Sequence, residues 1–237
     1  MSSKLNFKRV LLKISGESLA GELQYGIDPK QTKKISKKIR LLVEKNVQVG
    51  IVIGGGNIFR GMSASAKGMN RVPADYLGML ATIMNSVALQ ASLENEDCDT
   101  RVMSALSITQ LAEPYIRRRA TRHLEKGRVV IFAGGTGNPY FTTDTAAALR
   151  GIEIDANIII KATKVDGIYS SDPVKDDNAI KFDEISFKDV IEKELGVMDL
   201  TAFTLCKENK LPIGIVNIND DSLIDFIDNK NVGSIIS

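Results

Sequence analysis

The stretch Val49-Gly50-Ile51-Val52-Ile53-Gly54-Gly55-Gly56-Asn57-Ile58-Phe59-Arg60-Gly61 joins an apolar run of strand length to three consecutive glycines and an arginine. It predicts a buried strand that ends in an anion-binding loop. Glycine allows positive φ and lets backbone N–H groups approach a ligand without interference from a Cβ atom, which suits a phosphate chain. Arg60 would add a fixed positive charge beside this loop.

The same pattern, a strand followed by a polar or glycine-rich loop, recurs in three other segments: Arg9–Glu17, Gly127–Asp144 and Asn157–Pro173. Helical patterns separate these strands, as in Asp28–Val43, where Asp-Pro can start a helix. Strands that alternate with helices predict an α/β fold, a three-layer αβα sandwich with a mainly parallel central sheet. Ligands of such sheets gather at the carboxyl ends of the strands, so we expect the four loops to share one crevice.

The bulk properties narrow the class of protein. At 237 residues and 43% hydrophobic content, the chain is predicted to form one domain, 1–237, with two lobes at roughly 1–150 and 151–237. A net charge of +2 gives no global sign of a nucleic-acid or membrane partner. Cys98 and Cys206 are far apart and outside any C-x-x-C pair, and the N-terminus does not resemble a secretory signal. We therefore expect a cytoplasmic protein without a disulfide framework or a zinc site.

The stretch Tyr76–Leu93 carries no charged residue. Its several polar side chains make it too polar for a membrane span, and it is predicted to be a buried helix. A helix that is apolar nearly all round needs partners on more than one side. It is therefore either central in the fold or part of a subunit contact, and we favour the contact.

A second helix, predicted over Pro114–Lys126 and closed by Gly127, is rich in arginine. Cations near its C-terminus complement the helix dipole, so a solvated face is the simplest interpretation. A regulatory anion site, a subunit contact and, least of all, nucleic-acid binding remain open. His123, the single histidine, is interpreted as a surface residue and not as a catalytic base.

The familiar phosphate fingerprints are missing. No G-x-x-x-x-G-K-[ST] occurs, and neither glycine-rich loop completes G-x-G-x-x-G. What remains is a set of phosphate-type loops with Lys13, Arg60 and Lys161 near strand ends. Two anion sites in one crevice suggest transfer between two phosphorylated ligands. Phosphoryl transfer needs mainly positioning and charge stabilisation, and positioning can contribute roughly 7–11 kcal/mol.

The scarcity of histidine favours a phosphate group as acceptor. A phosphomonoester, with a second pKa of about 6, is largely a dianion at pH 7 and needs no base. Asp144 is then more plausible as a group that orients lysines or the acceptor loop, although it could also cap the following helix. Lys161 stands within an apolar strand and needs a partner. Lys13 and Arg60 could still be surface charges, and each glycine loop taken alone could be a tight turn.

Taken together, five stretches resemble the uridylate kinases of bacteria, within the amino-acid-kinase superfamily: Lys13–Glu17, Ile53–Gly61, Gly68–Arg71, Gly134–Asp144 and Lys161–Gly167. The likeness runs over essentially the whole chain, and Met198–Phe203 also looks like that family. One glycine loop alone would be a weak signal, but this set in this order is specific. The resemblance implies a carbamate-kinase-like fold and the reaction of ATP and UMP to ADP and UDP with Mg²⁺, in a homohexamer that serves pyrimidine nucleotide synthesis.

The resemblance also implies residue roles. ATP would be held by Lys13, Ile14, Ser15, Gly16, Gly56, Arg60, Thr163, Tyr169 and Asp172. UMP would be held by Gly55, Asp75, Thr136, Gly137, Asn138, Pro139, Tyr140, Phe141, Thr142 and Thr143, with Asp75 on the ribose hydroxyls. Lys13 and Arg60 would stabilise the transferring phosphoryl group, Asp144 would organise the centre, and Lys161 completes the catalytic set. No protein metal ligands are implied, because Mg²⁺ would arrive with the ATP phosphates.

Members of this family often respond to GTP and UTP, which are therefore possible effectors. The effector residues implied here are Gly21, Glu22, Leu23, Gln24, Tyr25, Gly26, Arg101, Arg117 and Arg128. Gln90 and Glu94 stand where some members carry Arg and His, which argues against strong GTP activation. Two other functions stay open: a carbamate or amino-acid kinase, and a nucleotide-sensing or DNA-binding regulator on the same fold.

Overall fold

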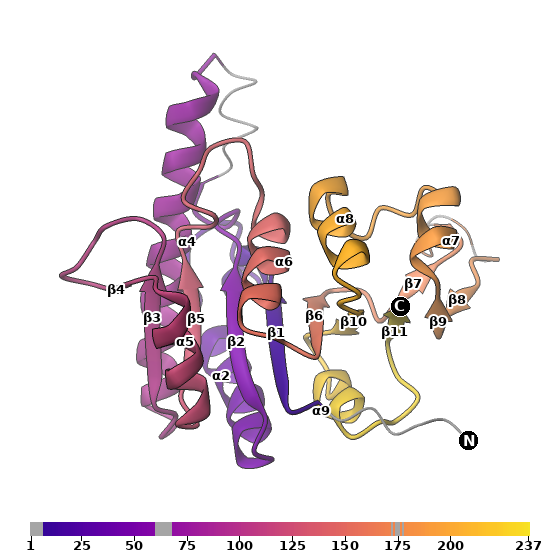
Figure 1. Ribbon diagram of the computed structural model, residues 1–237, viewed down its shortest axis with the longest axis horizontal. Helices are drawn as coiled ribbons and strands as arrows, with labels where there is room; N and C mark the ends of the chain where they lie inside the picture. Colours follow the sequence, from indigo (N-terminus) through magenta and orange to yellow (C-terminus); the bar gives the residue numbers. More distant parts are fainter. Residues whose placement is uncertain (1–6, 60–67, 172, 174–175, 177) are drawn as a thin grey trace.

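The computed structural model describes residues 7–59, 68–171, 173, 176 and 178–237. Strands and helices alternate along the chain in the following order (Figure 1): β1 (Arg9–Ile14), α1 (Gly16–Ala20), α2 (Pro29–Glu44), β2 (Gln48–Ile53), α4 (Arg71–Glu94), β3 (Thr100–Ser104), β4 (Glu113–Pro114), α5 (Arg117–Glu125), β5 (Val129–Ala133), α6 (Thr143–Glu153), β6 (Ile158–Thr163), β7 (Ile168–Tyr169), β8 (Lys181–Phe182), β9 (Glu184–Ile185), α7 (Phe187–Glu192), α8 (Leu200–Glu208), β10 (Ile213–Asn217), α9 (Ser222–Ile227) and β11 (Ser234–Ile236).

A nine-stranded sheet runs through the protein in the order β4-β3-β5-β2-β1-β6-β10-β11-β9. Only the pair β10–β11 is antiparallel, and the other neighbouring strands of this sheet pair in parallel. Strands β7 and β8 form a separate antiparallel pair. Helices cover both faces of the large sheet (Figure 1). The predicted α/β fold with a mainly parallel central sheet and flanking helices is therefore confirmed.

Strand β1 shows how the sheet divides two cores. Val10, Leu12 and Ile14 join the core formed with α2, α4 and α9. Leu11, between them, joins the opposite core, which contains side chains of α5, α6, α7 and α8. Since successive strand residues point to opposite faces, Lys13 lies on the same side as Leu11, under α6.

Among the described residues, N-cap side chains accept backbone hydrogen bonds at the start of four helices, α2, α6, α7 and α8. The carboxylate of Asp28 accepts from the N–H of Lys30 at 2.9 Å, which confirms Asp-Pro as the start of α2. Thr142 caps α6, and Asp199 caps α8 by accepting from Ala202 N–H at 2.9 Å. The alternative that Asp144 caps α6 is therefore wrong, because the hydroxyl of Thr142 takes that position.

Helix α4 differs from the expected buried helix in having two unlike faces. One face packs towards α2 and β3, and it buries the polar residues Thr82, Asn85 and Ser86 along with apolar ones. The other face exposes five large apolar side chains, those of Val72, Tyr76, Leu77, Leu80 and Met84. By length and composition α4 is the single candidate for a membrane span among the described residues, and 44% of that window is buried inside the fold.

Two predictions around the arginine-rich helix need correction. The helix begins at Arg117 and not at Pro114, because Glu113–Pro114 pairs with the end of β3 as the short strand β4. His123 is less exposed than predicted, since its side chain is only 12% exposed. Its ring lies 3.3 Å from a Glu113 oxygen and 3.1 Å from a nitrogen of Arg128. Gly127 does follow the helix with φ +73, as predicted for a C′ glycine.

Candidate active site

Three charged side chains meet at the carboxyl ends of the two central strands. Lys13 Nζ lies 2.7 Å from one carboxylate oxygen of Asp144, and Lys161 Nζ lies 3.0 Å from the other. The three side chains are between 11% and 19% exposed. Each lysine therefore binds its own oxygen of a single, largely buried carboxylate, and the cluster carries one net positive charge.

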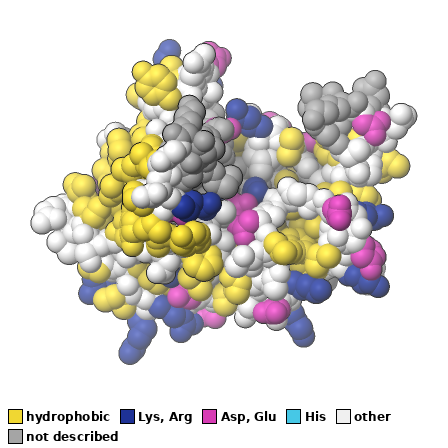
Figure 2. Space-filling model, turned by 90° about the horizontal axis from the view of Figure 1, so that it is seen from above, with side chains coloured by type: hydrophobic (Ala, Val, Ile, Leu, Met, Phe, Trp, Pro, Cys, Tyr) yellow, Lys and Arg dark blue, Asp and Glu magenta, His cyan; other side chains and the backbone are white. Residues whose placement is uncertain are grey.

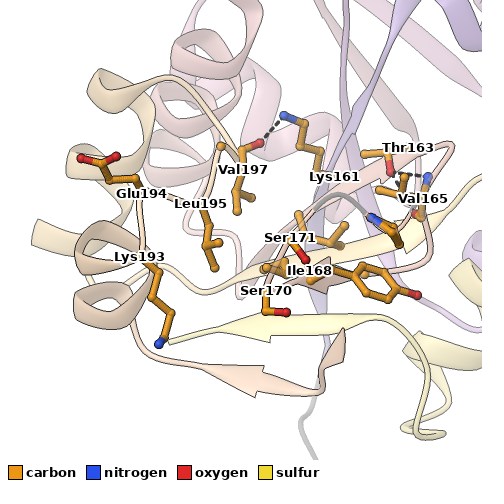
Figure 3. Close-up of a pocket in the computed structure, with 15 residues that line it drawn as sticks. Lys161, Thr163, Val165, Ile168, Ser170, Ser171, Lys193, Glu194, Leu195 and Val197 are labelled. Carbon is orange, nitrogen blue, oxygen red and sulfur yellow. Dashed lines mark hydrogen bonds between the residues drawn. The ribbon is translucent and has the colours of Figure 1, made fainter. Parts of the chain in front are cut away.

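The sheet register produces this arrangement. Lys13 of β1 and Lys161 of β6 are directly paired residues of adjacent parallel strands, so their side chains leave the same face of the sheet. Helix α6 covers that face and supplies Asp144 from its first turn, where a carboxylate is favoured by the helix dipole. Lys161 also donates to the backbone oxygen of Val197 (Figure 3). A lysine within an apolar strand was predicted to need a partner, and Lys161 has two, Asp144 and the backbone oxygen of Val197.

The cluster perturbs the titration of its members. Burial by itself would raise the pKa of Asp144, but the two nearby ammonium groups outweigh it and hold this pKa below its usual value. Burial lowers the pKa of Lys161, and the attraction of Asp144 opposes that change while the repulsion of Lys13 adds to it. Asp144 is therefore a poor proton acceptor at neutral pH and a good electrostatic organiser.

The first glycine-rich loop lies directly against the N-terminus of α1. Gly54 N–H donates to Ile14 O at 2.9 Å, so the loop continues the register of β1 and β2. A Cβ atom on Gly16 would come within 2.4 Å of the Asn57 amide oxygen and 2.6 Å of Gly54 O. The two loops that carry Ser15–Gly16 and Gly54–Gly56 can pack this closely only because both contain glycine.

A cavity of about 550 Å³ opens on one side of the cluster. Its lining includes Lys161 and Thr163 at the end of β6, Tyr169 of β7, and the segment Lys193–Val197 that precedes α8. Figure 3 shows Lys161, Thr163 and Val165 on one side of this space and the segment 193–197 on the other. Its size and its mixture of apolar and polar groups suit a nucleoside.

A smaller cavity, about 190 Å³, opens towards α4 and is lined by both glycine-rich loops. Gly55 comes from the first loop, and Gly135, Thr136, Asn138, Phe141, Thr142 and Thr143 come from the second. Gly134, Gly135 and Gly137 all have positive φ, a conformation that turns backbone N–H groups towards an anion. Thr143 is the chain neighbour of Asp144, so the charged cluster lies between the two cavities.

Asp75 lies in the lining of the smaller cavity, in the first turns of α4. Its carboxylate accepts from Arg71 Nε at 2.8 Å and from Tyr140 N–H at 2.8 Å. Arg71 in turn lies over the ring of Tyr140, with Cζ 5.7 Å from the ring centroid. Asp75 thereby holds the second glycine-rich loop at Tyr140.

Most of the predicted site residues therefore gather at one edge of the sheet, around the cluster and the two cavities. Arg60 and Asp172 lie outside the described residues. The arginines predicted to bind effectors stand away from the two linings: Arg117 pairs with Asp155 at 3.0 Å, while Arg101 and Arg128 approach Glu113 and Asp99 at 4.0 Å. The segment 21–26 contacts the first glycine-rich loop through Gly26, whose N–H donates to Asn57 O at 2.7 Å.

Several groups of the site were not predicted from the sequence. Val197 supplies only a backbone oxygen, so no side-chain signal could have revealed it. Asp199 accepts from the hydroxyls of Thr142 and Thr145, which ties the start of α8 to the start of α6. Arg71 stands in a stretch that supported the family resemblance, yet its ion pair with Asp75 was not foreseen.

The arrangement is that of a phosphotransferase, with two cavities on either side of a cationic centre and no histidine in the described linings. A comparison with protein families agrees, since residues 8–217 match the amino acid kinase family. The chain therefore belongs to the amino acid kinase family.

Solved structures narrow the relationship within that family. The chain is similar to the UMP kinase from Bacillus anthracis, with 38% identity, a TM-score of 0.94 and coverage of 98% of this chain and 96% of that one. It is also similar to the UMP kinase from Ureaplasma parvum, with 37% identity, a TM-score of 0.92 and coverage of 98% and 99%. The uridylate kinase from Archaeoglobus fulgidus is more distant, with 28% identity, a TM-score of 0.74 and coverage of 96% and 99%. The chain thus stands among the UMP kinases of its family.

Proposed function

We propose that this protein transfers the γ-phosphoryl group of ATP to UMP, giving ADP and UDP, as a step of pyrimidine nucleotide synthesis in the cytoplasm. The observation that supports this most directly is the Lys13–Asp144–Lys161 cluster between two cavities. ATP occupies the larger cavity and UMP the smaller one. Likeness to two UMP kinases over nearly the whole chain supports the choice of acceptor.

In this proposal the chain contributes charge and positioning. An oxygen of the UMP phosphate attacks the γ-phosphorus, the bond to the β-phosphate oxygen of ATP breaks, and ADP leaves. No base is needed because the acceptor phosphate, with a second pKa of about 6, is already ionised. Lys13 and Lys161 neutralise the charge that develops on the transferred group, while Asp144 keeps both ammonium groups in place.

Substrate-binding roles in this proposal combine the cavity linings with the family resemblance. Residues Lys13–Gly16, Gly56, Thr163 and Tyr169 hold ATP, together with Arg60 and Asp172, and the division into lobes at about residue 150 belongs to the same proposal. Gly55 and Thr136–Thr143 hold the UMP phosphate, and Asp75 holds the ribose. The observed bonds of Asp75 to Arg71 and Tyr140 keep its carboxylate at the cavity wall.

Mg²⁺ in this proposal is carried by the ATP phosphates. Within the part of the chain that the structure describes, no group of three histidine, cysteine or acidic side chains forms a metal site. The carboxylate of Asp144 is already paired with two lysines. This arrangement fits an Mg²⁺ ion bound to the ATP phosphates better than one bound by protein ligands alone. Mg²⁺ usually keeps its waters and binds through substrate phosphates, where it neutralises their charge.

The exposed apolar face of α4 is proposed to join copies of the chain into a hexamer. Tyr76, Leu80 and Met84 are 41%, 42% and 55% exposed and lie one turn apart along the helix. Figure 2 looks down on the end of the molecule from which α4 projects in Figure 1, and it shows a broad hydrophobic area on one side of that end. GTP and UTP remain proposed effectors of such an assembly.

Light scattering of a Leu80→Lys variant tests the assembly. Leu41→Lys on α2 is a control of similar exposure. A wild-type protein that is a monomer would contradict the proposed hexamer.

A coupled assay for ADP release tests the proposed activity. UMP, CMP, AMP, glutamate and carbamate are offered as acceptors, and UMP is expected to give the highest kcat/KM. Preference for carbamate or glutamate would assign the chain to another reaction of its family. DNA binding without turnover, falling steeply with salt, would instead favour a regulator.

A further inference from the structure

Helix α4 touches both glycine-rich loops through two side chains on one turn. Thr82 and Asn85 are three residues apart and therefore share a face of the helix, and they are 3% and 0% exposed. The hydroxyl of Thr82 accepts from Gly134 N–H at 2.9 Å, at the start of the second loop. The amide nitrogen of Asn85 donates to Gly54 O at 2.7 Å, at the start of the first loop.

Asn85 also forms a reciprocal pair with Asn57, the residue that ends the first loop. Asn85 Nδ2 donates to Asn57 Oδ1 at 2.7 Å, and Asn57 Nδ2 donates to Asn85 Oδ1 at 3.0 Å. Asn57 Nδ2 donates in addition to Gly26 O at 2.7 Å. Asn85 thus holds both ends of the three-glycine run. Because this pair is buried and satisfied, an altered loop position would leave polar groups without partners.

Close packing reinforces these bonds. A Cβ atom on Gly55 would lie 2.8 Å from Gly78 O and 2.9 Å from the Cβ atom of Ala81, both on α4. The middle of the first loop is therefore pressed against the same helix that bonds its two ends. The hydroxyl of Thr82 also donates to Met79 O at 2.6 Å, which fixes the rotamer that presents its oxygen to Gly134.

We propose that Thr82 and Asn85 are positioning residues that set the separation of the two phosphate loops, Thr82 for the acceptor and Asn85 for the donor. The inference rests on the proposed function, because it assigns the second loop and Gly55 to UMP, and Gly56, next to Asn57 at the end of the first loop, to ATP. Neither side chain takes part in the chemistry, although Thr82 also lines the smaller cavity. They act by holding backbone groups, and phosphoryl transfer depends strongly on such positions, since a displacement of about 1 Å can reduce the rate about 10²-fold.

Steady-state kinetics of two variants tests these separate roles of Thr82 and Asn85. Thr82→Val keeps the shape of the side chain but removes the acceptor for Gly134 N–H, and KM for UMP is expected to rise about tenfold while KM for ATP stays within about twofold. Asn85→Ala is expected to raise KM for ATP about tenfold and KM for UMP by less, because Gly55 of the same loop faces UMP. Both variants should also lower kcat. Thr82→Ser restores a hydroxyl and should recover KM for UMP.

Ser86→Ala is the matched control. Ser86 is fully buried on the same turn, but its hydroxyl donates to Thr82 O inside the helix and not to either loop. Both KM values of this variant should stay within about twofold of wild type. If Asn85→Ala does not fold, the effect of Asn85 on KM for ATP is measured with the milder variant Asn85→Ser.

A second readout does not depend on turnover. Hydrogen exchange at the Gly134 amide should be slow in the wild type and in Thr82→Ser, and faster in Thr82→Val. Equal changes in both KM values, or changes no larger than those of Ser86→Ala, would overturn the assignment. Preference of the wild type for an acceptor other than UMP would overturn the proposed function instead, and the same split measured with that acceptor would still decide the roles of Thr82 and Asn85.

Discussion

Replacing Asp144 by asparagine tests the central electrostatic argument. The change keeps the size of the side chain but removes the charge that Lys13 approaches at 2.7 Å and Lys161 at 3.0 Å. Two ammonium groups about 4–8 Å apart repel by roughly 2–4 kcal/mol at an effective dielectric constant of 20. Removal of one partner from a buried ion pair typically costs about 3–5 kcal/mol of stability.

We expect Asp144→Asn to lower the thermal midpoint by roughly 6–20 °C, using about 2–4 °C per kcal/mol for a chain of this length. A comparable loss of about 3 kcal/mol in the transition state lowers kcat about 10²-fold. KM for UMP should change much less, because Asp144 acts on the lysines that meet the transferred group and not on the acceptor loop. Calorimetry and steady-state kinetics measure both effects.

The double variant Asp144→Asn/Lys161→Met separates the repulsion between the two lysines from the loss of activity. It removes one of the two ammonium groups that Asp144 separates, so part of the lost stability should return while activity stays low. A normal kcat together with a large rise in KM for UMP would refute the role assigned to Asp144. So would a double variant less stable than the single one.

Three further predictions concern the neighbourhood of the cluster. Because burial lowers the pKa of Lys161, its charge in the free enzyme is lost at lower pH than in a free lysine, and the alkaline limb of kcat/KM should fall below about pH 10.4; a profile of kcat/KM with a limb above that value would contradict this. Gly16→Ala places a methyl group 2.4 Å from the Asn57 amide oxygen, so the unfolding free energy should drop by about 1–3 kcal/mol and KM for ATP should rise, as denaturant titration and kinetics would show. Asp199→Ala removes the acceptor for the Thr142 hydroxyl and should lower the free energy of unfolding by about 1–3 kcal/mol. An unchanged denaturation midpoint would show that this hydrogen bond between the starts of α6 and α8 does not stabilise the fold.

Local patterns predicted most of the architecture. The apolar runs before each glycine-rich or polar loop became β1, β2, β5 and β6, and Asp28 starts α2 as expected. The short strands β4, β7, β8, β9 and β11 were not predicted, because two or three residues carry no periodic pattern and their pairing depends on distant partners. The two-faced character of α4 escaped prediction for a related reason. Its exposed face is as apolar as its buried one, so composition alone could not distinguish them.

The site residues differ in how far their roles could be predicted from the sequence. A lysine within Ile158–Ala162 had to have a partner, and the partner is Asp144 at 3.0 Å. The roles of Thr82 and Asn85 were not visible, since a threonine or asparagine in a helix shows its bonding partner only when the loops are in place. His123 was misjudged for the same reason, because its neighbour Glu113 comes from a separate strand.

The sequence by itself determined the alternation of strands and helices, the glycine loops at strand ends and the kind of ligand that they suit, because these depend on side-chain period and on the backbone freedom of glycine. Only the tertiary structure decided which groups meet. Lys13 and Lys161 are 148 residues apart in the chain, and the parallel register of β1 and β6 makes them neighbours beneath one carboxylate. The hold of α4 on both loops likewise arises from packing, which no local pattern specifies.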